Sequence, residues 1–360
     1  MRTAELIFPD GTKFRGQSFG AEKIAAGEAV FTTAMTGFEL ALTDPSFADQ
    51  ILVFTFPLVG NYGVPNFDRD EFGILKNFES EKIYAAGVVV ANFSAEFSHH
   101  RAAQSFRDFL ISQKIPAIAG VDTRKLTEFL RDRGSSSAQI VPENLKPEKN
   151  FYDPNAENLV AKVSIQKPKI FAPKNFQKTI VAVDTGIKNN ILREFLRRKI
   201  RVILVPWNFD LRNLNEKIDG LFLANGPGDP RAILPEIKNA VEFAREKNWP
   251  IFGICLGNQL LNLAFGGSVS KMKFGNRGAN QPVQNLQNEK CFVTAQNHGF
   301  AVEENSLPRD FEVWFKNLND GSVEGIRHKK LPIFSVQFHP EAAPGPTECG
   351  FLFDEFLAGV

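Results

Sequence analysis

The chain has 360 residues, of which 43% are hydrophobic and 23% are charged, proportions typical of folded globular proteins. At about 100–200 residues per domain, this length indicates two domains, and the composition excludes a disordered or fibrous chain. The 42 Lys and Arg residues nearly balance the 41 Asp and Glu residues, giving a net charge of +1, so we expect neither a nucleic-acid partner nor binding to a membrane.

Cysteine usage points to a reducing compartment. The three cysteines are Cys255, Cys291 and Cys349, and they form no CxxC pair or Cys/His cluster. This odd, sparse count argues against a disulfide scaffold, and we expect no metal site. The N-terminus lacks the apolar core of a signal peptide, and no apolar run approaches the ~18–20 residues of a membrane span. We therefore expect a cytoplasmic protein.

Residues 1–150 have the pattern of an α+β domain. Pro9-Asp10-Gly11 predicts a hairpin turn between strands at residues 5–8 and 12–15. Further strands are predicted at the compact apolar runs 51–56, 87–91 and 115–121. A helix is predicted at residues 101–113, and Asp122 is placed to cap a second helix that ends at Gly134.

Residues 151–178 differ in character from both neighbouring segments. Prolines are mixed with Lys and Asn there, and helical periodicity is poor. We interpret this segment as the connection between the domains, with one short strand at residues 159–165.

Residues 179–360 show alternating strands and helices. Strands are predicted at 179–183, 202–205, 221–224 and 251–254, helices at 188–198, 235–247 and 256–265, shorter strands after residue 290, and a last helix at 351–357. Apolar strands separated by helices indicate an open, mostly parallel sheet flanked by helices on both faces. The fold class is therefore α/β, preceded by the smaller α+β domain.

The sharpest motif is Gly253-Ile254-Cys255-Leu256-Gly257, which joins a predicted strand directly to a predicted helix. This is the G-x-C-x-G form of the nucleophile elbow. The glycines permit a tight turn, and the helix N-terminus favours a thiolate. Cys255 is therefore the candidate nucleophile.

Two other segments supply candidate partners for Cys255. His339 and Glu341 are two residues apart around Pro340, so on an extended segment they point the same way and Glu341 can orient the imidazole as the third member of a triad. The loop Asn225–Pro230 follows a strand, and the backbone N–H groups of Gly226 and Leu256 are a candidate oxyanion hole.

Each of these motifs has an ordinary structural explanation when taken alone. A cysteine after a buried strand is usually a core residue, and His-Pro-Glu or Gly-Pro-Gly segments are usually turns and loops. Their joint occurrence at strand ends favours catalysis. Cys291 is interpreted as a strand residue and Cys349 as incidental.

The motifs around Cys255, Asn225–Pro230 and Phe338–Glu341 resemble the class I (triad) glutamine amidotransferases, which implies a flavodoxin-like C-terminal domain. The segments 43–46, 120–124, 296–301 and 338–346 are similar to the carbamoyl-phosphate synthase small-subunit family. The resemblance covers nearly the whole chain, and it implies an N-terminal small-subunit domain over 1–150, a linker over 151–178 and a glutaminase domain over 179–360.

The resemblance also assigns roles to individual residues. It implies that Cys255 is the nucleophile, with His339 and Glu341 as its triad partners. The implied glutamine contacts are Ser46, Gly226, Gly228, Leu256, Gln259, Asn297, Gly299 and Phe300. The implied reaction is hydrolysis of L-glutamine through a Cys255 thioester.

The resemblance further implies a protein partner. The family passes its ammonia to a large synthetase subunit, which makes carbamoyl phosphate from bicarbonate and ATP for arginine and pyrimidine biosynthesis. No cofactor is expected on this chain, because ATP and Mg belong to the partner, and a heterodimer or an oligomer of heterodimers is implied.

The chain departs from the family pattern at a few positions. Asn258 stands where His is usual, Asn276-Arg277 and Asn280-Gln281 replace His-containing pairs, and Thr185 stands where Phe or Tyr is common. Two alternatives therefore stay open: a largely non-catalytic binding subunit of the same complex, and a glutaminase that serves a different synthetase.

Overall fold

The computed structural model describes residues 2–360, which divide into two compact units, one ending at Glu157 and one running from Asn158 to Val360. Within the described residues no helix combines the length and apolar character that crossing a membrane requires.

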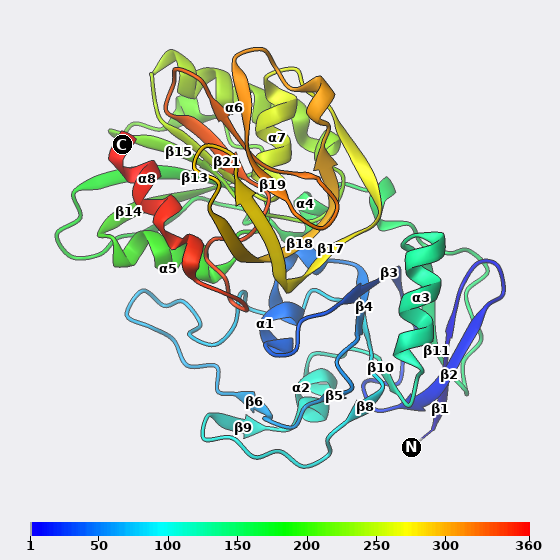
Figure 1. Ribbon diagram of the computed structural model, residues 1–360. Coiled ribbons are helices and arrows are strands. Elements are labelled where there is room, and N and C mark those ends of the chain that lie inside the picture. The colour runs from blue at the N-terminus through cyan, green and yellow to red at the C-terminus, as the bar shows by residue number, and fades with distance from the viewer. Residues whose placement is uncertain (1) are drawn as a thin grey trace. The chain divides into compact units, whose positions relative to one another are not determined.

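The first unit is built on a closed barrel of seven strands in the order β1-β11-β3-β4-β7-β10-β2 (Figure 1). The barrel strands are β1 (Thr3–Ile7), β2 (Lys13–Ser18), β3 (Ala25–Thr32), β4 (Gln50–Phe54), β7 (Gly87–Val89), β10 (Ala117–Ala119) and β11 (Ser136–Pro142). Strands β1 and β2 pair antiparallel, which confirms the predicted hairpin. Two short sheets join β5 (Leu58–Val59) to β8 (Asn92–Phe93) and β6 (Val64–Pro65) to β9 (Ala102–Gln104).

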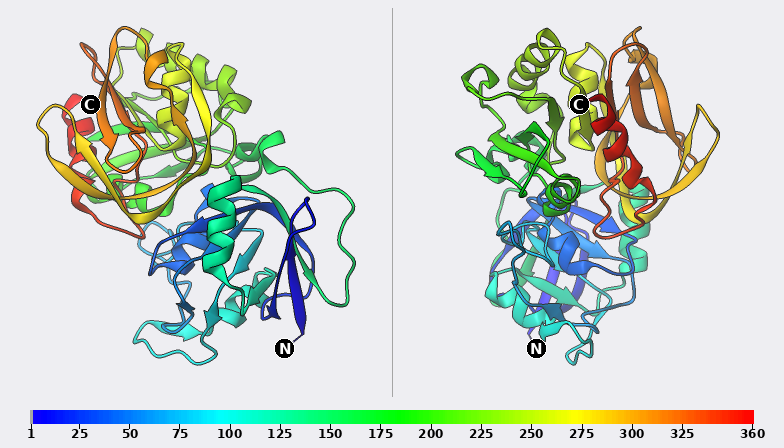
Figure 2. Two further views of the ribbon diagram at one scale, coloured as in Figure 1. Left: turned by 45° about the vertical axis from the view of Figure 1, so that its right-hand side comes forward. Right: turned by 90° about the vertical axis from the view of Figure 1, so that its left-hand side faces the viewer.

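Strand β4 is buried on both faces, because helices pack on each of them. Ile51 and Val53 of β4 belong to one core with Leu126 and Leu130 of α3 (Thr123–Arg133). Their neighbour Leu52 belongs to a second core with residues of α1 (Phe38–Thr43) and α2 (Phe106–Ser112). Figure 2 shows α3 lying along the barrel strands. Burial on both faces explains why the apolar run of β4 is continuous and does not alternate with polar residues.

The helix predicted at residues 101–113 is shorter in the structure. Its first part forms β9, which pairs with β6, and α2 starts only after Ser105, whose side chain accepts a hydrogen bond from the Asp108 N–H. The predicted cap of α3 is confirmed, since the Asp122 carboxylate accepts the Lys125 N–H at 2.9 Å and the helix ends at Gly134.

The second unit contains a ten-stranded sheet in the order β12-β14-β13-β15-β16-β21-β20-β18-β17-β19. Its strands are β12 (Lys169–Phe171), β13 (Lys178–Asp184), β14 (Ile200–Pro206), β15 (Gly220–Leu223), β16 (Ile251–Ile254), β17 (Val269–Asn285), β18 (Cys291–Val302), β19 (Phe311–Asn317), β20 (Val323–His328) and β21 (Ile333–Val336). The five strands from β14 to β21 are parallel in the flavodoxin-like order 2-1-3-4-5, as expected, whereas β12, β17, β18, β19 and β20 make only antiparallel pairs.

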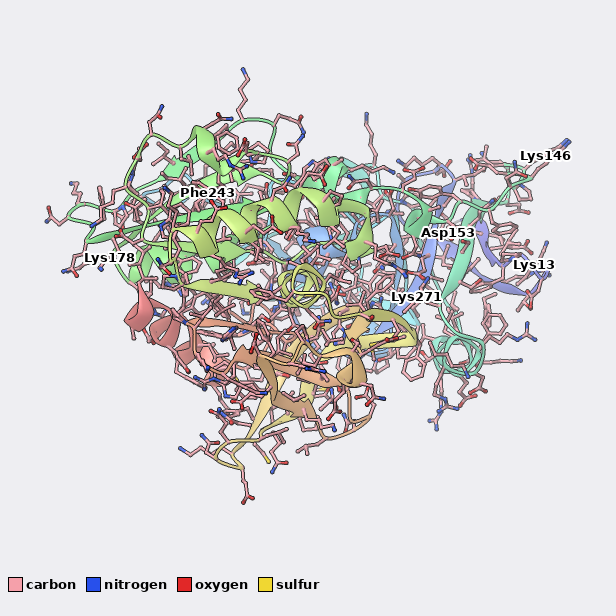
Figure 3. All side chains as sticks on the ribbon, turned by 90° about the horizontal axis from the view of Figure 1, so that it is seen from above. Lys13, Lys146, Asp153, Lys178, Phe243 and Lys271 are labelled. Carbon is pink, nitrogen blue, oxygen red and sulfur yellow. The ribbon has the colours of Figure 1, made fainter. Side chains whose placement is uncertain are left out.

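Helices cover both faces of the parallel strands (Figure 1). On one face α6 (Leu234–Glu246) and α7 (Leu256–Ala264) share a core with Leu221, Ile251 and Ile333. On the other, Phe222 and Phe252 pack against aromatic rings of α5 (Asn189–Arg197) and α8 (Phe351–Gly359). Phe243 of α6, labelled in Figure 3, packs edge-on against Trp249.

The strand predicted at residues 159–165 is wrong. Residues Leu159–Val163 form the short helix α4, because the Asn158 side chain caps it by accepting the Ala161 N–H at 3.0 Å. Farther along the same segment, β12 pairs with β14, so residues 158–178 pack as part of the second unit.

Candidate active site

The turn between β16 and α7 carries Cys255 in a strained backbone conformation, with φ 55° and ψ −102°. Its N–H donates to the Val336 carbonyl at 2.8 Å, which fixes the turn to the neighbouring strand β21. A Cβ atom on Gly253 would lie 2.6 Å from the Gly257 carbonyl oxygen, and one on Gly257 would lie 2.2 Å from that of Leu223. Both glycines of the motif are therefore required by close backbone contacts.

The thiol of Cys255 is buried and faces strand β18. The residue is 2% exposed, and its Sγ lies 3.5 Å from the Asn297 carbonyl oxygen. The nucleophile candidate and a predicted glutamine-contact segment therefore meet, although 42 residues separate them in sequence.

His339 and Glu341 follow β21 and form a buried pair. The His339 Nδ1 lies 2.6 Å from Glu341 Oε1, and the His339 N–H donates to the Ala295 carbonyl of β18 at 2.8 Å. The bond from Nδ1 to the carboxylate leaves Nε2 as the ring atom that faces the reaction.

Lys188, which the sequence analysis did not identify, completes this charged chain. Its Nζ lies 3.0 Å from Glu341 Oε1 and donates to the Ala342 carbonyl at 2.6 Å. The residue follows β13 and begins α5. A lysine at the carboxyl end of a parallel strand was the available signal, but nothing in the sequence links it to Glu341.

These charges set the protonation of the pair. Burial is the largest single influence on the pKa of His339 and lowers it, but the charge and hydrogen bond of Glu341 and the hydrogen bond with Cys255 together raise the pKa to about 10. Burial acts to raise the pKa of Glu341, whereas Lys188 and His339 lower it to about 2. At neutral pH the pair is therefore an imidazolium beside a carboxylate.

The imidazole and the thiol are neighbours. A hydrogen-bonding contribution from Cys255 helps to raise the pKa of His339, while Nε2 has no hydrogen bond of ordinary length and angle to any described residue. Catalytic hydrogen bonds are often long before substrate binds, so this geometry suits proton exchange between a thiol, a leaving group and Nε2.

The loop after β15 lies close to the turn that carries Cys255. A Cβ on Gly226 would lie 2.0 Å from the Thr185 carbonyl oxygen and 2.9 Å from the Leu256 side chain. The Thr185 hydroxyl lies 2.9 Å from the carbonyl oxygens of both Ala224 and Asn225. Thr185, a departure from the family pattern, thus helps to hold the loop. Leu256 is the first residue of α7, and its N–H has no acceptor inside the helix.

The other predicted glutamine contacts lie at three places in the structure. Gln259, Asn297, Gly299 and Phe300 lie together, because the Gln259 side chain donates to the Phe300 carbonyl at 2.9 Å. Gly228 lies in the loop after β15 with φ 86°, and a Cβ added to it would lie 3.3 Å from the Leu159 side chain. Ser46 belongs to the first unit, in the short 3₁₀ helix Pro45–Phe47, where its N–H donates to Asp44.

The departures near the site have defined partners. Asn258 donates to Gln337 at 3.2 Å and accepts from Ser335 at 2.9 Å, within the buried interior. Asn276 donates to Asp320 at 3.0 Å, and Arg277 donates to the Phe274 carbonyl. None of these contacts disturbs the triad.

The remaining cysteines lie apart from this chemistry. Cys291 is the exposed first residue of β18, as predicted, and Cys349 is buried, where burial raises its pKa to about 12. Among residues 2–360 no group of three or more His, Cys, Asp or Glu side chains is arranged to hold a metal ion.

Two family models match this chain. The model for glutamine amidotransferase class-I matches residues 181–358, and the model for the carbamoyl-phosphate synthase small chain, CPSase domain, matches residues 6–140. The matched ranges fall on the second and the first unit, respectively.

Curated relatives match over nearly the whole chain. The arginine-specific small chain of carbamoyl phosphate synthase from Neurospora crassa is 46% identical and covers 99% of this chain and 80% of its own length. The multifunctional protein CAD of Squalus acanthias is 48% identical over 98% of this chain but only 16% of its own length. The multifunctional protein URA2 of Saccharomyces cerevisiae is 44% identical over 100% of this chain and 18% of its own length.

Proposed function

This chain belongs to the carbamoyl-phosphate synthase small-chain family and carries a class I glutamine amidotransferase domain, and from that premise we propose that Cys255, His339 and Glu341 hydrolyse L-glutamine. The observation that carries the proposal is the buried 2.6 Å contact between His339 and Glu341 beside a cysteine held at positive φ.

The first half of the reaction forms a thioester. The Cys255 thiolate attacks the side-chain amide carbon of glutamine, and the electron pair of the C=O bond moves to the oxygen. The N–H groups of Gly226 and Leu256 stabilise this oxyanion, each donor being worth about 2.7–4 kcal/mol. The oxyanion then collapses, the C–N bond breaks, and the His339 Nε2 proton goes to the nitrogen, which leaves as ammonia.

The second half of the reaction releases glutamate. Neutral His339 takes a proton from water, the oxygen attacks the thioester carbon, and the C–S bond breaks to restore the Cys255 thiolate. Glu341 and Lys188 keep the imidazole oriented through both halves, which is the part a triad carboxylate plays.

Glutamine recognition is proposed to use the residues around the thiol. We assign the substrate contacts to Ser46, Gly226, Gly228, Leu256, Gln259, Asn297, Gly299 and Phe300. In the second unit, the Cys255 thiol lies 3.5 Å from the Asn297 carbonyl oxygen, and the Gln259 side chain donates to the Phe300 carbonyl at 2.9 Å.

The ammonia is proposed to serve a large synthetase subunit. Free ammonia is protonated in water and loses its nucleophilicity. Transfer to a partner that uses ATP, Mg and bicarbonate would let the ammonia react before it is protonated. We propose a heterodimer, or an oligomer of heterodimers, and no cofactor on this chain. We propose that the carbamoyl phosphate serves arginine and pyrimidine biosynthesis, and the name of the Neurospora relative supports the arginine pathway.

The test replaces Cys255 by Ser in the chain assembled with its large subunit. We expect carbamoyl phosphate synthesis from glutamine to be lost, while synthesis from ammonium is retained. The matched control is Cys291→Ser, which changes an exposed thiol and should leave both activities intact.

Two outcomes would overturn the proposal. Equal use of glutamine by the Cys255→Ser variant would show that the thiol is not the nucleophile, and absence of glutaminase activity in the wild-type complex would favour a non-catalytic binding subunit. Glutaminase activity without carbamoyl phosphate formation, together with co-purification of another synthetase, would indicate a different acceptor.

A further inference from the structure

A second buried imidazole, that of His298, lies within the segment assigned to glutamine binding. Its Nδ1 is 2.9 Å from the Phe300 carbonyl oxygen, and its Nε2 is 3.1 Å from the Gln296 side-chain oxygen Oε1. A backbone carbonyl can only accept a hydrogen bond, so Nδ1 must carry a proton.

The orientation of the Gln296 side-chain amide determines whether the His298 Nε2 carries a proton. The Thr294 hydroxyl has one proton, which it donates to the Gln281 carbonyl at 2.9 Å. It can therefore only accept from Gln296, whose Nε2 lies 3.3 Å away. The amide nitrogen thus faces Thr294 and the oxygen Oε1 faces His298, so the His298 Nε2 must also carry a proton. This geometry describes an imidazolium.

A buried cation requires a counter-charge, and Glu324 is in place to supply it. Glu324 Oε1 lies 3.9 Å from His298 Nε2, and both side chains are at most 1% exposed. The carboxylate accepts from Asn317 at 3.0 Å. The Ser322 hydroxyl lies 3.3 Å from Glu324 Oε1 but has its shorter contact, 2.7 Å, with Asp320, and Glu324 Oε2 has no hydrogen-bond partner among the described residues.

Other charged groups also act on the pair. Arg277 from β17 and His339 after β21 oppose a charge on His298, whereas Asp320, in the turn between β19 and β20, favours it. Asp320 also opposes a charge on Glu324, while hydrogen bonds from Asn317, Ser322 and Gln296 favour one. Glu324 is the only carboxylate within ion-pair distance of His298 in residues 2–360.

The position of the His298–Glu324 pair lets it hold a neighbouring strand in place. The Phe300 carbonyl accepts from His298 and also from Gln259, which lies one turn after Cys255 in α7. The pair therefore holds one end of a hydrogen-bonded link between the glutamine-binding strand and the helix that carries the nucleophile.

We propose that His298 and Glu324 share one proton as a buried imidazolium–carboxylate pair that positions the segment Asn297–Phe300 for glutamine. The functional part of this inference rests on the proposed glutaminase activity. Both residues are positioning residues, because they act through the Phe300 carbonyl.

The pKa values of the two groups are those of a pair that holds a single proton. Burial alone would place that proton on Glu324, whereas the hydrogen bonds of the two His298 ring nitrogens place it on the imidazole. Burial lowers the pKa of His298 to about 4 and raises that of Glu324 to about 8. A proton is therefore retained by the pair at neutral pH and lost as the pH rises through about 8. We expect the KM for glutamine to increase above that pH.

The first test locates the proton without measuring activity. In the complex prepared with ¹⁵N-labelled histidine in this chain, NMR at pH 7 should show both His298 ring nitrogens protonated, with the signals assigned by their absence in His298→Gln. Only five histidines are present, so the spectrum is simple. A neutral ring in the wild-type chain would overturn the proposal whether or not the chain hydrolyses glutamine.

The second test measures positioning. Glu324→Gln removes the counter-charge at nearly constant volume, and we expect the KM for glutamine to rise about tenfold with kcat within about twofold. The rise in KM above pH 8 should disappear. The control Glu303→Gln changes an exposed carboxyl and should behave like wild type. A Glu324→Gln variant with wild-type KM and pH profile would contradict the positioning role.

Discussion

Three buried charged groups, Lys188, Glu341 and His339, determine the protonation state of the His339 imidazole. Lys188 contacts Glu341 at 3.0 Å, and Glu341 contacts His339 at 2.6 Å. Removing one member of a buried charged group leaves the others uncompensated, which is more costly than the group itself is stabilising. The imidazole therefore depends on Lys188 through Glu341, which contacts both of them.

Replacing Lys188 by Met tests this dependence. Without the ammonium group the pKa of Glu341 should rise, and the carboxylate should orient His339 less well, so kcat/KM for glutamine should fall roughly 10²-fold or more. The measurement is the glutaminase rate of the complex across pH. Lys174→Met, at an exposed position, is the matched control, and equal rates for both variants would exclude a role for Lys188.

Individual residues also show which parts of the site could not be predicted from the sequence. His339 and Glu341 were predictable as a pair because they are only two residues apart, although the structure holds them in a turn, where the Ala342 N–H donates to the His339 carbonyl at 3.1 Å, and not on the extended segment that the sequence suggested. Lys188 is about 150 positions from Glu341, and only the pairing order of β13, β15, β16 and β21 brings them together. Thr185 was noted as a departure, but its hydroxyl contacts with the oxyanion loop depend on the same topology.

The turn between β16 and α7 is the element that the sequence specified most fully, because its glycines are required by backbone contacts. Gly257→Ala would place a Cβ 2.2 Å from the Leu223 carbonyl oxygen. We expect this variant to lose at least about 2 kcal/mol of unfolding free energy together with glutaminase activity.

The control for this element is Gly350→Ala. Gly350 has φ −57° and nothing within 4 Å of an added Cβ, so this substitution should leave stability and activity unchanged. Urea denaturation monitored by circular dichroism measures both variants. Equal midpoints for the two variants would contradict the contact argument.

The cap of α3 gives a prediction for the first unit. Asp122→Ala removes the acceptor for the Lys125 N–H and should cost about 0.5–2 kcal/mol of that unit's stability. Asp132→Ala, near the other end of the same helix and exposed, should cost less. Hydrogen exchange of the α3 amides distinguishes them, and equal protection in both would refute the cap.

The predicted boundaries of helices and strands were wrong where a polar side chain caps the start of a helix. The apolar run at 159–165 suggested a strand, yet Asn158 caps a helical turn there. The helix predicted from residue 101 starts after Ser105 for the same reason, since a cap satisfies the first N–H groups of the helix. Apolar periodicity found the elements, and capping decided where they begin.

At the scale of the whole molecule, the two units form a module that occurs in two settings. Separate small chains such as the Neurospora relative share 80% of their length with it, whereas the multifunctional relatives share only 16–18% of theirs. The same glutaminase and small-chain sequences are therefore compatible both with a separate polypeptide and with a much longer one.

The unfolding free energy of the whole chain should depend on pH through the His339–Glu341 pair. The pKa of Glu341 is lowered from 4.5 to about 2, so its stabilising contribution is present above pH 4.5 and is lost as the pH falls toward 2. The pKa of His339 is raised from 6.5 to about 10, so its contribution is present below pH 6.5 and is lost as the pH rises toward 10. The pair therefore stabilises the fold most between pH 4.5 and 6.5.

The measurement compares wild type with the double variant His339→Asn, Glu341→Gln, because titrating groups that do not interact with the pair cancel in the difference of their unfolding free energies. That difference should be largest between pH 4.5 and 6.5 and should decline on both sides, since the variant retains neither charge. A difference that stays constant from pH 3 to 9 would mean that the pair is uncharged in the folded chain. In that case the imidazolium could not supply the proton that the departing ammonia requires.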